Sequence, residues 1–226
     1  MEINICMILI NGCSHSAELT PGNTYWSTLL KQHTAHEIVN VSFPGASNHR
    51  IFRTTINHLS TASVKPSLVI IGWTCHERFE YSFDSKIEYY NFQRHNLFTQ
   101  PSPHKDFLKF ADLHLADWEF GLTNTLTYMC ALQQFLKSHN IPYLYINMFN
   151  SIPTVLTAED QCLFDMLDKN CYLNPHQSVI QEMIETFQHT NPEYFDNTMH
   201  LVDEHKHQEI ADAITNTDAW KHNIGH

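Results

Sequence analysis

The stretch ILINGCSHS, residues 8–16, begins with a run of branched apolar side chains. This run is followed by an asparagine, a glycine, a cysteine and a serine. An apolar run that stops at such residues is typical of a buried strand followed by a tight turn. Open parallel α/β sheets place their chemistry at the carboxyl ends of the strands. Ser14 is therefore a candidate nucleophile. The alternative is that Ser14 and Ser16 only cap the next helix, which is a common use of serine.

Further strands and helices alternate along the chain. The first strand is expected at residues 3–10, and three more segments have the same apolar character, at residues 37–42, 67–72 and 143–148. Apolar residues at helical spacing predict helices between and after them, at residues 25–33, 48–60, 123–139, 177–189 and 203–214. Alternation of this kind with short joints predicts an α/β fold, in which helices cover both faces of a parallel sheet.

Composition restricts the class of protein. The 226 residues suit a single domain, residues 1–226, and 42% of them are hydrophobic, which is enough for a sizeable core. The net charge of −11 disfavours a nucleic-acid partner, because an acidic surface repels phosphates. The six cysteines form no CxxC pair, which favours free thiols in a reducing compartment. No signal-peptide pattern or bilayer-length apolar run occurs, so we expect a cytoplasmic protein without a membrane partner.

Residues 76–122 interrupt the alternation. They carry many aromatic side chains without a clean period, and two prolines, at positions 101 and 103. A long irregular segment inside a compact domain is often a lid or a cap. The alternative is a helical excursion packed on the edge of the sheet. We treat the segment as an aromatic-rich insertion whose rings either pack in the core or stack on sugar rings.

Four short blocks occur in a recognisable order. Three follow the first three predicted strands and the fourth precedes the last predicted helix: residues 11–14, 40–45, 70–74 and 200–204. In order and placement these blocks resemble the SGNH/GDSL hydrolase family over the whole chain. The resemblance implies a three-layer α/β/α sandwich of the flavodoxin-like kind. It also implies hydrolysis of an ester by a serine, with no cofactor and no metal.

The resemblance also implies roles for particular residues. Ser14 matches the nucleophile, His200 the general base and Gly45 the glycine whose backbone N–H serves the oxyanion hole. These residue types suit the chemistry, because a serine hydroxyl needs a base to remove its proton and imidazole titrates near neutrality. Glycine has no Cβ, so its N–H can approach a developing oxyanion.

Two positions depart from the family pattern. The family has asparagine two residues after the glycine of the third strand, where this chain has Thr74. Thr74 itself or Asn48 is the candidate replacement for that oxyanion donor. The family also has aspartate three residues before the histidine, where this chain has Asn197. Asp196 would orient the imidazole if the chain bulges by one residue; otherwise the site is a Ser-His dyad or a backbone carbonyl orients the ring.

Other residues near the strand ends are candidates for substrate binding, namely His15, Trp73 and Arg78. Arg78 belongs to a charged segment at residues 73–80. The alternative to substrate binding by this segment is a loop held by salt bridges. Cys13 is a less favoured nucleophile, because its place matches the family's aspartate. His207 is a less favoured base, because it falls inside the last predicted helix.

A metal site built on the histidines at positions 200, 205 and 207 is disfavoured, because histidines two residues apart on a helix do not share a face. The sequence thus predicts a serine esterase or acyl hydrolase that cleaves a small-molecule ester. An acetylated carbohydrate or an acyl ester is the expected substrate, and the reaction passes through an acyl-serine. The alternatives are a non-catalytic binding or scaffold protein that retains the fold, and an acyltransferase that uses the same serine.

Overall fold

The computed structural model describes residues 6–19, 24–82, 89–92, 106, 109–110, 113, 117–187, 189–196 and 200–225. Its centre is a five-stranded sheet in which all neighbouring strands are parallel, in the order β2-β1-β3-β6-β7. The strands are β1 (Met7–Asn11), β2 (Glu37–Asn40), β3 (Leu68–Trp73), β6 (Tyr143–Asn147) and β7 (Tyr172–Leu173). The predicted parallel sheet is confirmed. β7 was not predicted, because it is only two residues long.

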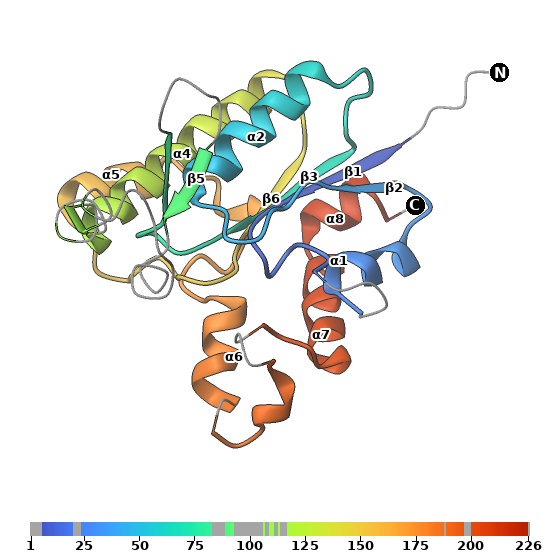
Figure 1. Ribbon diagram of the computed structural model, residues 1–226. Coiled ribbons are helices and arrows are strands. Elements are labelled where there is room, and N and C mark those ends of the chain that lie inside the picture. Colours follow the sequence, from blue (N-terminus) through green and yellow to red (C-terminus); the bar gives the residue numbers. More distant parts are fainter. Residues whose placement is uncertain are drawn as a thin grey trace.

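Helices cover both faces of this sheet (Figure 1). One layer contains α2 (Asn48–Thr61), α4 (Trp118–Ser138) and α5 (Ala158–Asp165), which pack in that order. The other contains α1 (Trp26–Leu29) with the 3-10 turn Leu30–His33, then α7 (Glu204–Thr215) and α8 (Asp218–Asn223). Two further segments, α6 (Val179–Phe187) and the 3-10 turn Pro192–Tyr194, precede α7. The result is the expected three-layer α/β/α sandwich.

Polar side chains fix where the helices begin. Ser47 accepts a hydrogen bond from Arg50 N at the start of α2, and Asp203 accepts one from Lys206 N at the start of α7. Asp117 caps α4 in the same way, so this helix begins at Trp118, five residues before the predicted start at residue 123. Serine and aspartate suit this position because their oxygens satisfy backbone N–H groups that have no partner within the helix.

The insertion is described only in part. It contains a two-stranded antiparallel hairpin, β4 (Phe79–Ser82) and β5 (Tyr89–Phe92), and β4 packs beside α2. The first turn of α4 forms its end. Phe83, Phe98 and both prolines, on which the lid hypothesis rests, lie outside the described residues.

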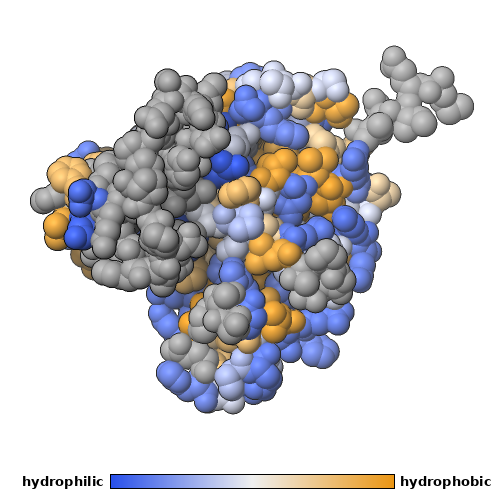
Figure 2. Space-filling view, in the orientation of Figure 1, coloured by the Kyte–Doolittle hydropathy of each residue, from blue (hydrophilic) through white to orange (hydrophobic). Residues whose placement is uncertain are grey.

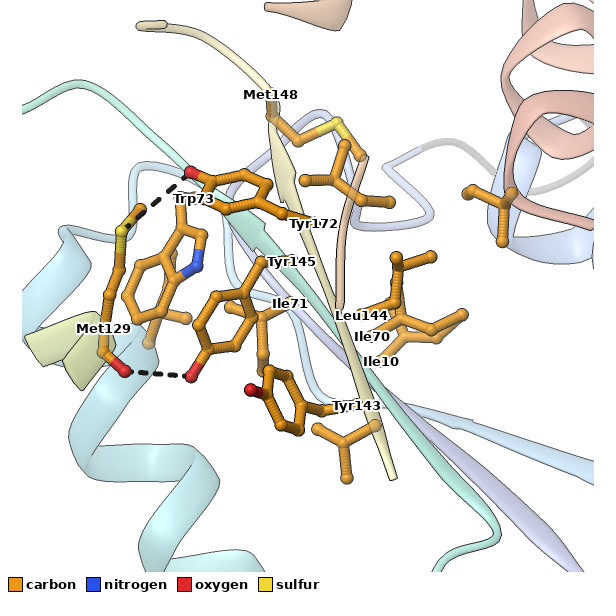
Figure 3. Packing of buried hydrophobic residues seen from close by; sticks show 14 of the residues in the cluster. Ile10, Ile70, Ile71, Trp73, Met129, Tyr143, Leu144, Tyr145, Met148 and Tyr172 are labelled. Atoms are coloured by element: carbon orange, nitrogen blue, oxygen red, sulfur yellow. Dashed lines mark hydrogen bonds between the residues drawn. The ribbon is translucent and has the colours of Figure 1, made fainter. Parts of the chain in front are cut away.

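The side of the sheet that faces α4 is packed with aromatic residues (Figure 3). Trp73 at the end of β3 has no exposed surface, and its ring meets Tyr145 edge-on with the centroids 5.3 Å apart. This burial counts against the prediction that Trp73 binds substrate. All six residues of β3 are buried, because helices cover both faces of the sheet. Its sequence therefore has no alternation of polar and apolar residues from which the direction of the Trp73 ring could be predicted.

The surface is mixed in character. In the orientation of Figure 1, hydrophobic residues reach the surface through the middle of the face, with hydrophilic residues along its right and lower margins (Figure 2). In the part of the chain that the structure describes, no helix combines the length and the apolar character needed to cross a membrane.

Candidate active site

The loops after β1, β2 and β3 are bound to one another. Phe43 N donates to Gly12 O at 3.0 Å, and Asn40 Nδ2 donates to Ser16 O at 2.7 Å. The Ser16 side chain fills the space beside Gly12 and Gly72, where any Cβ would overlap its hydroxyl. These glycines are therefore required by close approach of the first and third loops. The arrangement fixes the backbone that carries Ser14.

Ser14 follows β1 directly and is 7% exposed. Its hydroxyl makes no hydrogen bond to any described residue, and in particular none to the His200 ring. The next side chain, His15, lies with its ring centroid 5.0 Å from that of His200. It also stacks on Phe149, beyond the end of β6, at 5.7 Å. The fold thus brings His200 from the far end of the sequence beside the neighbour of Ser14.

His200 and Asp196 are joined by two hydrogen bonds. Asp196 Oδ1 accepts a hydrogen bond from His200 N at 2.9 Å and lies 3.7 Å from His200 Nδ1. Asp196 N in turn donates to His200 O at 2.9 Å, next to an antiparallel bridge between Phe195 and Leu201. The carboxylate and the imidazole are therefore adjacent. Asn197, the other residue at issue, lies outside the described residues.

Burial dominates the protonation of both imidazoles. Burial, the charge of His200 and the charge of Arg78 lower the pKa of His15 to about 3, so this ring is neutral at pH 7. Burial also lowers the pKa of His200 below its ordinary value. There Asp196 acts in the opposite direction and Arg78 in the same direction as burial. A neutral His200 is the form that can accept a proton.

The three residues expected to serve an oxyanion differ in availability. Gly45 has a φ of 74°, a left-handed conformation that suits glycine, and its N–H donates to no described residue. Asn48 donates both N–H groups of its buried amide, to Thr74 O and to Thr125 Oγ1. Asn48 Oδ1 also accepts from Thr74 N at 2.8 Å. The Asn48 side chain therefore joins α2 to the end of β3 and α4, and has no N–H left for an oxyanion.

Arg78 reaches back to the end of β3. Its Nη1 donates to Thr74 Oγ1 at 3.0 Å, and its guanidinium carbon lies 5.9 Å from the centroid of the Phe149 ring. The salt-bridged alternative applies to another residue of the same segment, because Glu80 is bound by Arg50 and Arg53. Of the proposed substrate-binding residues, Arg78 and His15 therefore lie at this corner. Phe149, which contacts both, was missed, although its place just after the fourth predicted strand was a usable signal.

The competing residues are occupied in other ways. His207 is buried inside α7, where Nδ1 accepts from Trp26 N and Nε2 donates to Leu201 O at 3.0 Å. Cys13 is fully buried in the core cluster. His76 is also buried, between Thr125 and the backbone of Ser151. Within the described ranges, no group of three or more His, Cys, Asp or Glu side chains is arranged to hold a metal ion.

A hollow of about 460 Å³ lies next to the loops after β1 and β2. Its lining includes Ala17, three residues after Ser14, and Pro44, which precedes Gly45. Asn40 and Ser42 contribute polar groups to the same wall. Its volume is in the range of small-molecule sites.

Solved structures with the same fold are esterases and hydrolases. A psychrotrophic esterase, EstA from Pseudoalteromonas sp., is 13% identical with a TM-score of 0.53, covering 93% of this chain and 95% of that one. LAE5, an α/β hydrolase from the metagenome of Lake Arreo, is 14% identical with a TM-score of 0.55 and covers 95% of each chain.

A lipolytic G-D-S-L family protein from Veillonella parvula is 11% identical with a TM-score of 0.50, covering 94% of this chain and 98% of that one. At these identities the likeness establishes the fold, which is that of the SGNH hydrolases. No curated protein matches the chain in sequence. A family described as a family of unknown function, DUF6071, matches residues 17–169. The chain belongs to this family, and its fold is distantly SGNH-like.

Proposed function

We propose that the protein is a serine hydrolase that cleaves a small ester through an acyl-serine intermediate. The observation that carries the proposal is the position of His200, whose ring lies beside that of His15 and within 3.7 Å of a carboxylate oxygen of Asp196. A serine, an imidazole and a carboxylate in this order form the standard arrangement for activating a hydroxyl. The hollow beside Ala17 and Pro44 lies next to the loops that carry Ser14 and Gly45, although neither Ser14 nor His200 lines it.

The reaction follows from these positions. Ser14 Oγ attacks the ester carbonyl carbon while His200 accepts the hydroxyl proton. The negative oxygen of the tetrahedral intermediate accepts a hydrogen bond from the backbone N–H of Gly45. Collapse breaks the ester C–O bond, and His200 returns its proton to the departing alcohol. Water then attacks the acyl-serine, with His200 again taking and returning a proton, so that a carboxylic acid leaves and Ser14 is restored.

The electrostatics of the site favour this sequence. The lowered pKa of His200 keeps its ring neutral at pH 7 and able to act as a base. Asp196 favours the imidazolium that forms after proton transfer, because its charge raises the pKa of His200. No hydrogen bond joins Ser14 to His200 before substrate binds, and such bonds are often long in free enzymes.

The choice of first substrate comes from a protein of the same fold. The Geobacillus protein Axe2 is an acetyl-xylooligosaccharide esterase, with a TM-score of 0.51 to this chain. Acetyl esters are therefore the first class to test, either an acetylated sugar or an activated aryl acetate. The fold is compatible with other acyl groups as well.

Hydrolysis of 4-nitrophenyl acetate by the purified protein tests the proposal. We expect turnover in the wild type, and a fall in kcat/KM on the order of a thousandfold or more in Ser14→Ala. The matched control is Ser27→Ala, which removes a buried hydroxyl in α1 that has no hydrogen-bond partner in the described part of the chain.

Equal rates for Ser14→Ala and the wild type would reject a serine hydrolase in favour of a binding or scaffold protein. Adding methanol to the active wild type distinguishes the remaining alternative. Methyl acetate as the main product would identify an acyltransferase, and acetate a hydrolase.

A further inference from the structure

Arg78 differs from the other arginines of its neighbourhood in having no carboxylate partner among the described residues. Arg50 and Arg53 both bind the buried carboxylate of Glu80, at 3.4 and 3.0 Å. Arg78 lies two positions from that glutamate in sequence, yet its guanidinium turns the other way, to Thr74 Oγ1. Arg50 and Arg53 therefore share one carboxylate, whereas Arg78 has no direct ion pair with any described residue.

This guanidinium without a direct ion pair lies at the candidate active site. Thr74 fixes one end of the guanidinium at 3.0 Å, and the ring of Phe149 lies 5.9 Å from its central carbon. The same ring stacks on His15, which lies beside His200. The charge of Arg78 lowers the pKa of both imidazoles, which is consistent with its closeness to them.

A partly buried guanidinium without a direct ion pair is able to bind an anion, which would offset part of its desolvation. Arginine has five N–H donors in a planar fork that matches a carboxylate, and the bond to Thr74 uses one of them. The protein as a whole carries a charge of −11 and repels anions, so recognition of an anion needs a local cation of this kind. Arg78 is the cation that meets this need at the site.

We propose that the ester substrate carries a carboxylate close to its scissile bond, and that Arg78 binds this carboxylate. The inference rests on the proposed function, because it identifies a substrate class for the same site. The carboxylate lies either on the acyl group or on the alcohol. In both cases Thr74 is a positioning residue, because it holds the guanidinium toward the site.

Two pairs of esters separate these cases. For the acyl side, the pair is 4-nitrophenyl hemisuccinate, which is anionic, and 4-nitrophenyl butyrate, which is neutral. For the alcohol side, the pair is 4-acetoxybenzoate and its methyl ester. We expect one pair to show a higher kcat/KM for the anionic member. In Arg78→Gln the ratio of anionic to neutral kcat/KM falls about tenfold or more, mainly through KM, as expected for loss of a hydrogen-bonded charge pair.

Three further variants sharpen the result. Thr74→Val keeps the charge but removes its anchor, and should lower the same ratio by a smaller factor. Arg78→Lys keeps the charge without the fork, and should give a ratio between the wild type and Arg78→Gln. Lys221→Gln makes the same charge change at an exposed position in α8, and should leave the ratio unchanged.

The contrary outcomes are distinct. Turnover of neutral esters with no anionic preference in either pair would overturn the inference and leave the hydrolase intact. Equal loss on both members of a pair in Arg78→Gln would overturn it as well, because Arg78 would then act on the reaction of every ester. Failure to turn over any of the four esters would count against the proposed function itself.

Discussion

Two buried regions of this molecule treat their hydroxyl groups in opposite ways. Between the sheet and α4, Tyr145 donates to Met129 O at 3.0 Å (Figure 3). In the same layer Tyr143 donates to Gln133 Oε1 at 2.8 Å, and Tyr172 donates to Asn147 Oδ1. Burial raises the pKa of all three, so they remain protonated donors. At the carboxyl end of β1, Ser14 is 7% exposed and its hydroxyl has no partner among the described residues.

The difference separates groups that hold the fold together from groups that remain available for chemistry. A hydroxyl that makes no hydrogen bond within the protein is available to a ligand. The three tyrosine hydroxyls are all bound within the protein. The corner around Ser14 and Arg78 has one hydroxyl and one cation that a bound ester would satisfy. Each prediction below tests whether a group belongs to one region or the other.

The largest contrast is expected between two histidines seven positions apart. His200→Gln should reduce esterase kcat/KM on the order of a thousandfold or more, because no base then takes the proton of Ser14. His207→Gln should leave kcat/KM close to that of the wild type. It should instead cost about 1–3 kcal/mol of unfolding free energy, because His207 bonds Leu201 O inside the core. Urea unfolding and ester hydrolysis, measured on both variants, check the pair; a reversed pattern would exchange their roles.

Trp73 should behave as a core residue. Trp73→Ala should lower the free energy of unfolding by about 3–5 kcal/mol, because it removes a fully buried ring from its contact with Tyr145. The measurement is urea denaturation followed by circular dichroism. A raised KM with unchanged stability would instead return Trp73 to the substrate site.

A smaller loss is expected in the tyrosine layer. Tyr143→Phe keeps the ring and removes only its hydroxyl, leaving Gln133 Oε1 with Asp168 N as its remaining donor. The expected cost is about 1 kcal/mol of unfolding free energy, with no change in kcat/KM. Loss of activity at full stability would show that the two regions are coupled.

The smallest effects are shifts of the acidic limb of the pH–rate profile. That limb reports protonation of His200. Burial lowers the pKa of His200 below its ordinary value, the charge of Arg78 lowers this pKa further, and the charge of Asp196 raises it. Removing the positive charge in Arg78→Gln should therefore move the limb to higher pH. Removing the negative charge in Asp196→Asn should move it to lower pH. Profiles of kcat/KM for a neutral ester check both directions, and shifts of the same sign would contradict this electrostatic interpretation.

The sequence predicted the frame of the fold better than the direction of individual side chains. Apolar runs and helical spacing located β1, β3 and β6 together with α2 and α7, because burial imposes those patterns. The two residues of β7 and the short helices α5 and α8 carry too little periodicity to be recognised.

Side-chain direction explains what was missed at the site. Trp73 and Arg78 were equivalent candidates in the sequence, but one ring enters the core and one guanidinium turns toward the histidines. Asn48 was a plausible oxyanion donor until its N–H groups proved to be donated to Thr74 and Thr125. Such differences depend on tertiary packing, which neither composition nor spacing records.

Reaction with a fluorophosphonate ester, followed by peptide mass spectrometry, tests the role of Ser14 most directly. An activated serine displaces fluoride and keeps the phosphonyl group, whereas an ordinary serine hydroxyl does not react. We predict a single adduct on Ser14 in the wild type, its absence in Ser14→Ala, and strongly slowed labelling in His200→Gln. An unlabelled wild type, or an adduct that remains in Ser14→Ala, would contradict the assignment of Ser14 as the nucleophile.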